Sequence, residues 1–560
     1  MEWALDLGTT NSLVARWDAT SGRPRVARLP TLCRKPDAED PLEAPNAVPS
    51  AVHITPVEGL MAQMGRRTWL RKRVFWGNWG LVGRPALEKN ATTIHPEFAT
   101  GFKHWLGRDP LRTMARMGKD TVSAREIARI FLREVLVAVK AETGERLKGI
   151  AMTVPVDAYE SYRAELSAIA RSLGLKNLKF VDEPVAAAAG YGLGLSARRR
   201  VLVVDFGGGT LDVALVELDA RSMEAGICKV LAKAGRPVGG DVVDRWLLED
   251  FLKTQDFKLP AQGTEATAFW RRLLLAESRR VKEGLYFRDQ ELFQITPPEE
   301  YRAIRSLGRK EYLEAHYERG QLNALLTGNG LYGAIEECVD EVLAHAGAHG
   351  LGGEAIDDVL MVGGSTLLPG VYPLLEDRFG RDRVRAWQPF EAVVNGACAI
   401  AAGAYNQSDY IVHDYAIVVH DSETHERQHT VIIPRGTRFP TRGDFWKRSV
   451  VPTCSLGEPE RVFKLVISEI GAPPDERWGV GWDADGQLHQ LRGDGERLIV
   501  PLNEKDPTLG HLDPPHPPSD RAPRLELAFG VNSDRWLCAT VRDLKTSKIL
   551  MKGEPVVRLL

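Results

Sequence analysis

Short apolar segments alternate with longer amphipathic segments up to residue 404 of this 560-residue chain. The short segments are bounded by Gly, Pro or Asp, as buried strands are. They are WALDL, SLVARWD, IAMTVP, KFVDEP, VLVVDFG, LDVALVEL and VLMVGG. Helical stretches lie between them, among them Ala124–Glu142, Ala158–Leu173 and Gly240–Lys253. Strands that alternate with helices in this way predict an α/β architecture.

The pattern changes beyond Tyr405, where helical periodicity fades. Short alternating segments take over, namely YAIVVHD, HTVIIP, RVFKLVISEI, RLIVPL, RLELAFGV and WLCATVRD. Clusters of Pro, Gly and Asp such as DPPHPPSDRAP separate them, which predicts an antiparallel β-sandwich without helices. We therefore predict an α/β domain over 1–405, a linker over 406–412 and an all-β sandwich over 413–560.

Composition and charge narrow the class of protein. The formal net charge is −2, which provides no overall attraction to nucleic acid or to an anionic membrane. The N-terminal segment MEWALD has no basic region, and no run of about 18 apolar residues occurs, so neither a signal peptide nor a membrane span is expected. The six cysteines include no CxxC pair, which argues against zinc ribbons and disulfide frameworks. We expect a cytoplasmic protein.

Two polar segments leave alternatives open. Residues 59–87 hold six basic and no acidic residues together with several tryptophans, which suits either a nucleic-acid or partner surface or a solvated insertion with local aromatic packing. The insertion is the simpler interpretation. His420, His425 and His429 lie in HDSETHERQH, where a metal site is one interpretation. A polar hairpin is favoured because neither a helix nor a cysteine supports metal ligation.

The strongest chemical signal is a pair of similar turns, each between two strand-like segments. Asp6–Asn11 and Asp205–Asp212 both begin with Asp and contain Gly and Thr. Glycines let the backbone approach a ligand, turn N–H groups point together at phosphate oxygens, and Thr hydroxyls add donors. An Asp at the start of each turn is suited to hold Mg²⁺ through its waters. The pair predicts a phosphate site.

A third glycine turn, Val362–Thr366, lies between a strand-like segment and a helical one. It suits close approach of a nucleoside. Other phosphate and nucleophile templates fail, because the chain has no GxxxxGK[ST] and no GxSxG. Gly190–Gly194 lacks the spacing of a dinucleotide fingerprint.

ALDLGTTNSLVARWD, VLVVDFGGGTLDVALVEL and VLMVGGSTLLPGVYPLLEDRFG occur in this order. They resemble the two phosphate motifs and the adenosine motif of the 70-kDa heat-shock chaperone family. Further similar segments are AVPSAV, TVP followed by Arg163, VDEPVAAAAGYG, VGGDVVD and PFEAVVNG. The resemblance covers 1–405. RLELAFGVNSDRWLCATVRDLKTSKI resembles the family's substrate-binding sandwich more faintly, and we expect the helical lid of typical members to be absent.

The resemblance implies a two-lobed actin-like (ribonuclease-H-like) nucleotide-binding domain with ATP or ADP and Mg²⁺ in a cleft. Asp6 and Asp205 would hold the metal through water. Glu183 and Asp212 would position the metal's waters or the attacking water, and Thr210 would assist. The expected nucleotide-binding residues are Gly8, Thr9, Thr10, Asn11, Gly207, Gly208, Gly209, Thr210, Gly239, Gly240, Lys282, Gly363, Gly364 and Ser365.

The chain also departs from the family's pattern. The resemblance implies a catalytic lysine directly after the alanine of a GxxA segment, but Leu87 follows Ala86, and Lys89 is the nearest substitute. Leu367 replaces the arginine expected to stack on adenine, and Phe390 replaces an expected aspartate. The acidic, leucine-rich linker is reduced to SDYIVHDYAI. These changes affect hydrolysis and interdomain coupling more than nucleotide binding.

We expect a chaperone-like monomer that hydrolyses ATP slowly and modulates its binding of unfolded client segments. The resemblance implies a J-domain co-chaperone and a nucleotide-exchange factor as further partners, with no nucleic acid and no membrane. Two alternatives stay open. The chain could be a nucleotide-dependent scaffold without hydrolysis, given Leu87 and Leu367. It could also be a sugar-kinase-like phosphotransferase, against which the sandwich and EPVAAAAGYG count.

Overall fold

The computed structural model describes the chain apart from residues 1, 38–43, 56–78, 91–94, 157–159, 196, 220–225, 256–264, 296–312, 348–355, 387–389, 409, 412, 421–425, 455–457, 472–479, 483–487, 491–498, 505–506, 533–534 and 560. It forms two compact units. The first consists of Met1–Ala158, Ala164–Gln407 and Asp475–Arg492. The second consists of Tyr159–Arg163, Ser408–Pro474 and Gly493–Leu560.

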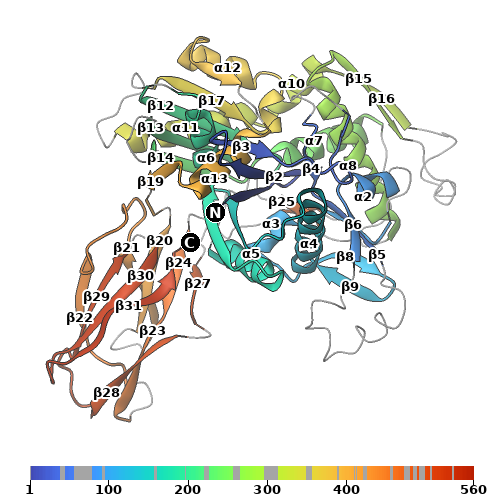
Figure 1. The fold of residues 1–560 in the computed structure, drawn as a ribbon. Helices are drawn as coiled ribbons and strands as arrows, with labels where there is room; N and C mark the ends of the chain where they lie inside the picture. The colour runs from blue at the N-terminus through green and yellow to red at the C-terminus, as the bar shows by residue number, and fades with distance from the viewer. Residues whose placement is uncertain are drawn as a thin grey trace. The chain divides into compact units, whose positions relative to one another are not determined.

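Within the described residues, the first unit contains two six-stranded mixed sheets (Figure 1). The first sheet has the order β11 (Asn177–Asp182), β10 (Gly149–Val154), β1 (Trp3–Leu7), β2 (Asn11–Asp18) and β3 (Arg23–Val26), with β4 (Val48–Pro49) pairing β2. The second has the order β18 (Val384–Ala386), β17 (Asp358–Val362), β12 (Arg199–Phe206), β13 (Leu211–Asp219), β14 (Gly226–Arg236) and β19 (Tyr405–Ser408).

The two sheets repeat one topology. In the first, β1 is parallel to β10 and forms an antiparallel hairpin with β2, and in the second β12 is parallel to β17 and forms a hairpin with β13. The helices repeat as well: each sheet continues from its parallel strand through a helix to an edge strand and a second helix. The first set is α5 (Glu160–Ser172) and α6 (Glu183–Gly192), and the second set is α12 (Val371–Phe379) and α13 (Ala392–Ala402).

This duplication confirms the predicted two-lobed α/β fold, which the alternation of strands and helices and the family resemblance indicated. It also explains why those turns resemble each other. Each turn joins the two strands of a central hairpin, one in each lobe. The second helices of the two sets, α6 and α13, pack against each other with very close backbones, because Gly190 and Gly396 lie at their crossing.

The remaining elements of the first unit surround these sheets. Helices α7, α8 and α11 contribute Trp246, Trp270 and Ile335 to the core over the second sheet, all at most 4% exposed. The helices are α2 (Arg84–Lys89), α3 (Lys103–Leu106), α4 (Ala124–Thr143), α7 (Gly240–Thr254), α8 (Glu265–Leu285), α10 (Arg319–Gly328) and α11 (Leu331–Gly347). The small sheets comprise β5 (Ala51–Thr55), β6 (Trp79–Val82), β7 (Phe98–Thr100), β8 (Thr113–Met117), β9 (Asp120–Ser123), β15 (Gln290–Ile295), β16 (Leu313–Glu318), β25 (Val480–Trp482) and β26 (Leu488–Gln490).

The second unit is the predicted β-sandwich, and its described residues contain no helix after Ser408. One sheet consists of β21 (Arg427–Ile433), β20 (Asp414–His420), β24 (Ile467–Ile470) and β27 (Ile499–Pro501). Another consists of β22 (Trp446–Val450), β29 (Leu525–Val531), β30 (Trp536–Asp543) and β31 (Ile549–Arg558), and β23 (Glu460–Leu465) pairs β28 (Thr508–His516). Ile432, Ile467, Phe529 and Val541 meet in one apolar core.

A buried ion pair joins Arg524, directly before β29, to Asp543, the last residue of β30. Arg524 and Asp543 are 2% and 1% exposed, and Nη2 of Arg524 lies 3.0 Å from Oδ2 of Asp543. Although burial alone would raise it, the pKa of Asp543 is lowered because Arg524 and two backbone N–H groups donate to its carboxylate. Removing one partner would leave a buried charge without compensation.

The expected elements agree with the structure at most positions, with two corrections. RVFKLVISEI was expected as one strand, but it divides between β23 and β24, which belong to different sheets. The cluster DPPHPPSDRAP was expected to separate strands, but its first four residues close β28, because an edge position tolerates proline. None of the helices in the described part of the chain combines the length and apolar character needed to cross a bilayer.

Candidate functional site

The two Asp-led turns meet in the first unit. Asp6 lies near the end of β1 and Asp205 near the end of β12, at equivalent places in the repeated sheets. A Cβ on Gly208 would lie only 2.3 Å from Oγ1 of Thr10, so the second turn touches the first. Glycine is therefore required there, because no side chain fits between the turns.

A cavity of about 640 Å³ opens over the turns, within the range of small-molecule sites. Fifteen of the sequence-predicted site residues line it together. They are Asp6, Gly8, Thr9, Thr10, Asn11, Glu183, Asp205, Gly207, Gly208, Gly209, Thr210, Lys282, Gly363, Gly364 and Ser365.

The first turn is held by a serine from the AVPSAV segment. Ser50 donates its hydroxyl to the carbonyl of Gly8 at 2.7 Å and its backbone N–H to the carbonyl of Thr10 at 2.8 Å. Ser50 is 3% exposed and also lies 2.9 Å from the hydroxyl of Ser12. These contacts fix the turn before any ligand arrives.

Lys103 is a buried basic residue that lines the cavity. Its Nζ lies 2.7 Å from Oε1 of Glu183, and both side chains are buried. Phe102, Trp105 and Leu106 are at most 3% exposed, so the short helix α3 is anchored in the core and presents Lys103 at the cavity. The buried ammonium is paired, as a buried charge must be.

Burial and neighbouring carboxylates raise the pKa values of Asp6 and Asp205. Burial, followed by the negative charge of Glu183, raises the pKa of Asp6 to about 6, although Lys103 and a hydrogen bond from Thr153 oppose the shift. Burial and the charges of Glu183, Asp212 and Asp6 hold the pKa of Asp205 well above its usual value. The single positive charge of Lys103 does not neutralise the negative charges of these carboxylates. A further cation would therefore stabilise their ionised forms.

Gly239 and Gly240 support the second turn from behind. A Cβ on Gly239 would lie 2.4 Å from the carbonyl oxygen of Gly208. The backbone N–H of Gly240 donates to the carbonyl of Gly207 at 3.1 Å, and that of Asp241 donates to Gly208 at 2.8 Å. The VGGDVVD segment thus braces the second Asp-led turn and does not line the cavity, whereas the resemblance implied direct contact with the nucleotide.

The third glycine turn closes another side of the cavity. Gly363 has φ of +86°, and a Cβ on it would lie 2.4 Å from the carbonyl oxygen of Phe206. Ser365 donates its hydroxyl to the carbonyl of Gly207 at 2.7 Å, which ties this turn to the second one. The segment continues as a short 3₁₀ turn, Gly364–Leu367, before α12 begins.

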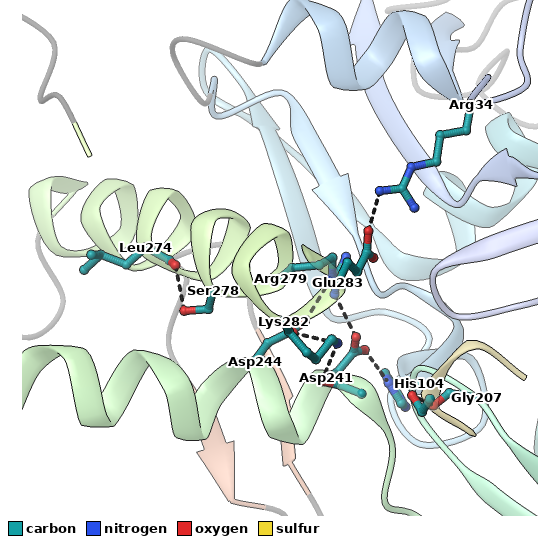
Figure 2. A network of polar contacts seen from close by, with 12 residues as sticks. Arg34, His104, Gly207, Asp241, Asp244, Leu274, Ser278, Arg279, Lys282 and Glu283 are labelled. Atoms are coloured by element: carbon teal, nitrogen blue, oxygen red, sulfur yellow. Dashed lines mark hydrogen bonds and ion pairs between the residues drawn. The ribbon is translucent and has the colours of Figure 1, made fainter. Parts of the chain in front are cut away.

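Lys282 lies in a network of ion pairs beside this turn (Figure 2). Its Nζ lies 2.7 Å from Oδ1 of Asp244 and donates to the carbonyl of Gly240 at 2.9 Å. Arg279 binds Asp241 at 2.7 Å and Asp244 at 3.0 Å. Lys282 is 4% exposed, so the network fixes it at the wall of the cavity.

The same network reaches two segments of the first lobe. Arg34 donates to Oε2 of Glu283 at 2.5 Å (Figure 2). Nε2 of His104 lies 3.5 Å from Oδ2 of Asp241. A Cβ on Gly209 would lie 2.2 Å from Cε1 of His104, so this ring packs directly on the second Asp-led turn.

Two residues expected to act in catalysis do not line the cavity. Lys89 ends α2, is exposed and does not line the cavity, so the structure does not place the expected substitute lysine at the site, and Lys103 lines the cavity instead. Lys89 was chosen because it lies two residues after Leu87 along the chain. Position along the chain does not show where a side chain points. Asp212 is 1% exposed and lies opposite Asp205 in the β12–β13 hairpin. Its Oδ1 accepts a hydrogen bond from the backbone N–H of Val156 at 2.8 Å, and Asp212 does not line the cavity.

Sequence reasoning missed Lys103 as a site residue. The available signal was a lysine beside Phe102 and before Trp105 and Leu106, a position that is buried if α3 packs. It also did not assign Tyr286, Phe287 or Arg34 to the cavity. Most of the basic and aromatic stretch 59–87 and one of the three histidines, His425, lie outside the described residues. His420 and His429 lie on the β20–β21 hairpin.

Comparisons with known proteins point to one family. A family model described as Hsp70 protein matches residues 3–451. The chaperone protein dnaK of Cyanidioschyzon merolae is 26% identical over 97% of this chain and 80% of the relative. The chaperone protein DnaK of Thermus thermophilus is 27% identical over 97% of this chain and 78% of the relative. For dnaK3 of Synechocystis the identity is 29%, and the chain spans 63% of that relative's length.

Proposed function

The chain belongs to the Hsp70 protein family, and from that premise we propose that it binds ATP with Mg²⁺, hydrolyses it slowly to ADP and phosphate, and thereby modulates its binding of client protein segments. One observation carries the proposal. Two equivalent Gly-Thr turns, each preceded by an Asp, line one cavity beside a buried Lys–Glu pair. That arrangement suits phosphoryl transfer to water, where positioning and charge stabilisation supply most of the catalysis.

Each group has a role that follows from its chemistry. The backbone N–H groups of Gly8–Thr10 and Gly207–Thr210 would hold phosphate oxygens. The Lys103 ammonium would stabilise the charge that develops on the transferred phosphoryl group. Glu183, held by Lys103, would orient the attacking water and accept its proton.

The donor set also fits Mg²⁺. Burial and the neighbouring negative charges raise the pKa values of Asp6 and Asp205, and a divalent cation would favour the ionised forms of both carboxylates. Within the described residues, no three His, Cys, Asp or Glu side chains are grouped to ligate a metal directly. The ion would therefore be held through its waters, as Mg²⁺ often is, and would neutralise phosphate charge when bound.

The presence of Lys103 favours hydrolysis over the alternative of a scaffold without hydrolysis. A single-turnover assay with radiolabelled ATP tests this, with and without a panel of sugars. Release of inorganic phosphate independent of sugar supports the proposal. Bound ATP that stays intact for hours would support the scaffold, and label transferred to a sugar would support the phosphotransferase.

The cellular setting is part of the proposal. All six cysteines are free thiols, which suits the reducing cytoplasm. We propose a monomer that acts with a J-domain co-chaperone and a nucleotide-exchange factor. Pull-down of such partners in the presence of ADP and of ATP tests this part.

Replacing Asp205 with asparagine is expected to lower Mg²⁺-dependent turnover by about 10- to 100-fold, the usual effect of losing an outer-shell metal partner. The amide keeps the size of the side chain but removes the charge that would hold the hydrated ion. The measurement is turnover against Mg²⁺ concentration. Asp289→Asn is the matched control, because the Asp289 side chain is 89% exposed. Equal turnover of Asp205→Asn and the control would contradict the assigned role.

Exchange of ADP for ATP is expected to accelerate release of a bound apolar peptide only about fivefold, near the low end of allosteric coupling. The reason is the linker SDYIVHDYAI, which lacks the acidic, leucine-rich character implied by the family resemblance. Stopped-flow release of a fluorescent peptide with each nucleotide measures this. A hundredfold acceleration by ATP would show strong coupling and overturn the expectation.

A further inference from the structure

The cavity wall beside the third glycine turn is aromatic and aliphatic. Leu367, Phe390 and Val393 line it together with Tyr286. The Phe390 ring lies on Gly364, since a Cβ there would be 3.1 Å from Cε1 of Phe390. The Tyr286 hydroxyl is hydrogen-bonded to Ser365, which holds the tyrosine ring beside the same turn. This group of rings and aliphatic side chains, here called the apolar wall, is suited to contact the flat face of a base.

Polar side chains that line the same cavity already have protein partners. Lys282 is held by Asp244 and the carbonyl of Gly240. Arg279 has both of its acidic partners at 3.0 Å or less (Figure 2). Glu283 accepts from Arg34 at 2.5 Å.

Three further polar side chains that line the cavity also have protein partners. The Ser365 hydroxyl donates to Gly207 at 2.7 Å. Arg280 and Arg288 both bind Glu291, at 3.0 and 2.7 Å. Each of these side chains therefore already has a protein partner, and a base that offers it no hydrogen bond would not leave it unpaired.

Discrimination between bases depends on such hydrogen bonds. A site built to hydrogen-bond a particular substrate group rejects analogues by factors of about 10⁴–10⁵, because its buried polar groups are otherwise left unpaired. Stacking on an aromatic face is tolerant of the base, because every base has a π face. The apolar wall offers stacking, whereas each of these polar side chains already has a protein partner that a mismatched base would leave in place.

From this geometry we infer that Phe390 is the stacking residue for the base and that the site accepts adenine and guanine nucleotides with similar affinity. The inference rests on the proposed nucleotide binding and specifies its base selectivity. In this chain the base adds affinity through the Phe390 ring, and the phosphate turns recognise the nucleotide. Leu367, where the family resemblance implies a stacking arginine, extends the same apolar wall.

The test measures binding of three probes with Mg²⁺ by calorimetry: ATP, GTP and tripolyphosphate, which has no base. For the unaltered chain we expect ATP and GTP affinities within about fivefold of each other. For Phe390→Ala we expect both to fall together, by about tenfold or more, in line with the loss of one stacked base. Tripolyphosphate binding should not change, which also shows that the variant is folded.

Two further variants sharpen the result. Phe390→Leu keeps an apolar side chain but has no π face, so it should lose affinity for ATP and GTP nearly as Phe390→Ala does. Phe445→Ala is the matched control, since Phe445 lies in the second unit and is 45% exposed. It should bind all three probes as the unaltered chain does.

The outcomes separate the two levels of the proposal. ATP binding at least a hundredfold tighter than GTP binding, or unchanged nucleotide affinity in Phe390→Ala, would overturn the inference and leave nucleotide binding intact. If ATP, GTP and tripolyphosphate all fail to bind the unaltered chain at millimolar concentration, both the inference and the proposed function are overturned.

Discussion

Replacing Lys103 with alanine is expected to slow single-turnover ATP hydrolysis by about 100- to 1,000-fold, the usual cost of removing one group that stabilises developing charge. Lys103 is buried, lies 2.7 Å from Glu183, and is part of the same cavity as Asp6 and Asp205. Its loss removes a positive charge where phosphoryl charge would develop. It also leaves Glu183 without the partner that orients it. ATP affinity, measured by calorimetry, should change much less than the rate.

Lys89→Ala is the matched control for that experiment. Lys89 is exposed at the end of α2 and does not line the cavity, so the same substitution should leave the hydrolysis rate unchanged. A slow Lys89→Ala variant together with a normal Lys103→Ala variant would reverse the assignment. Lys103→Arg separates charge from position, because it keeps the positive charge but changes the length and shape of the group.

Replacing Gly396 with alanine is expected to lower the free energy of unfolding of the first unit by about 3 kcal/mol, the upper range of overpacking effects. A Cβ at this position would lie 1.6 Å from the carbonyl oxygen of Ala186 and 2.5 Å from the backbone nitrogen of Gly190. These atoms belong to α6, whose backbone cannot move without disturbing Glu183 at its first turn. We therefore expect slower hydrolysis as well as lower stability.

Thermal unfolding and limited proteolysis measure this effect. The matched control is Gly333→Ala in α11, where a Cβ would meet nothing within 4 Å. That variant should be as stable as the unaltered chain or more stable by about 0.5–1 kcal/mol, because alanine favours a helix over glycine. Equal stability of the Gly396 and Gly333 variants would show that the two helices separate easily, contrary to the packing described.

The sequence predicted the bounds of those strands and helices that depend on residues close together along the chain. Alternating apolar segments located WALDL at the strand Trp3–Leu7 and WLCATVRD at the strand Trp536–Asp543 with the bounds the structure has. Helix α4 begins at Ala124 as predicted, because Ser123 caps it and Glu126 completes a capping box. The family resemblance is confirmed by the comparisons.

Local patterns were insufficient where a residue's role depends on distant segments. RVFKLVISEI is continuous in pattern, yet Val466 separates strands that pair with different partners, β28 and β20. The strands β3 and β14 were not assigned, although each completes the hairpin arrangement of its sheet. Strand pairing is decided by neighbours far along the chain, so a single segment does not specify it.

By itself, the sequence determined the two Asp-led turns, the third glycine turn and the two-part organisation of the chain, because glycine, aspartate and apolar periodicity act within a few residues. Only the tertiary structure decided which lysine faces the carboxylates, since Lys103 and Lys89 differ in what their helices pack against. It also decided that Lys282 and Arg279 are paired with acidic residues of α7. The direction of a side chain follows from the packing of its element against the rest of the fold, and no local pattern encodes that packing.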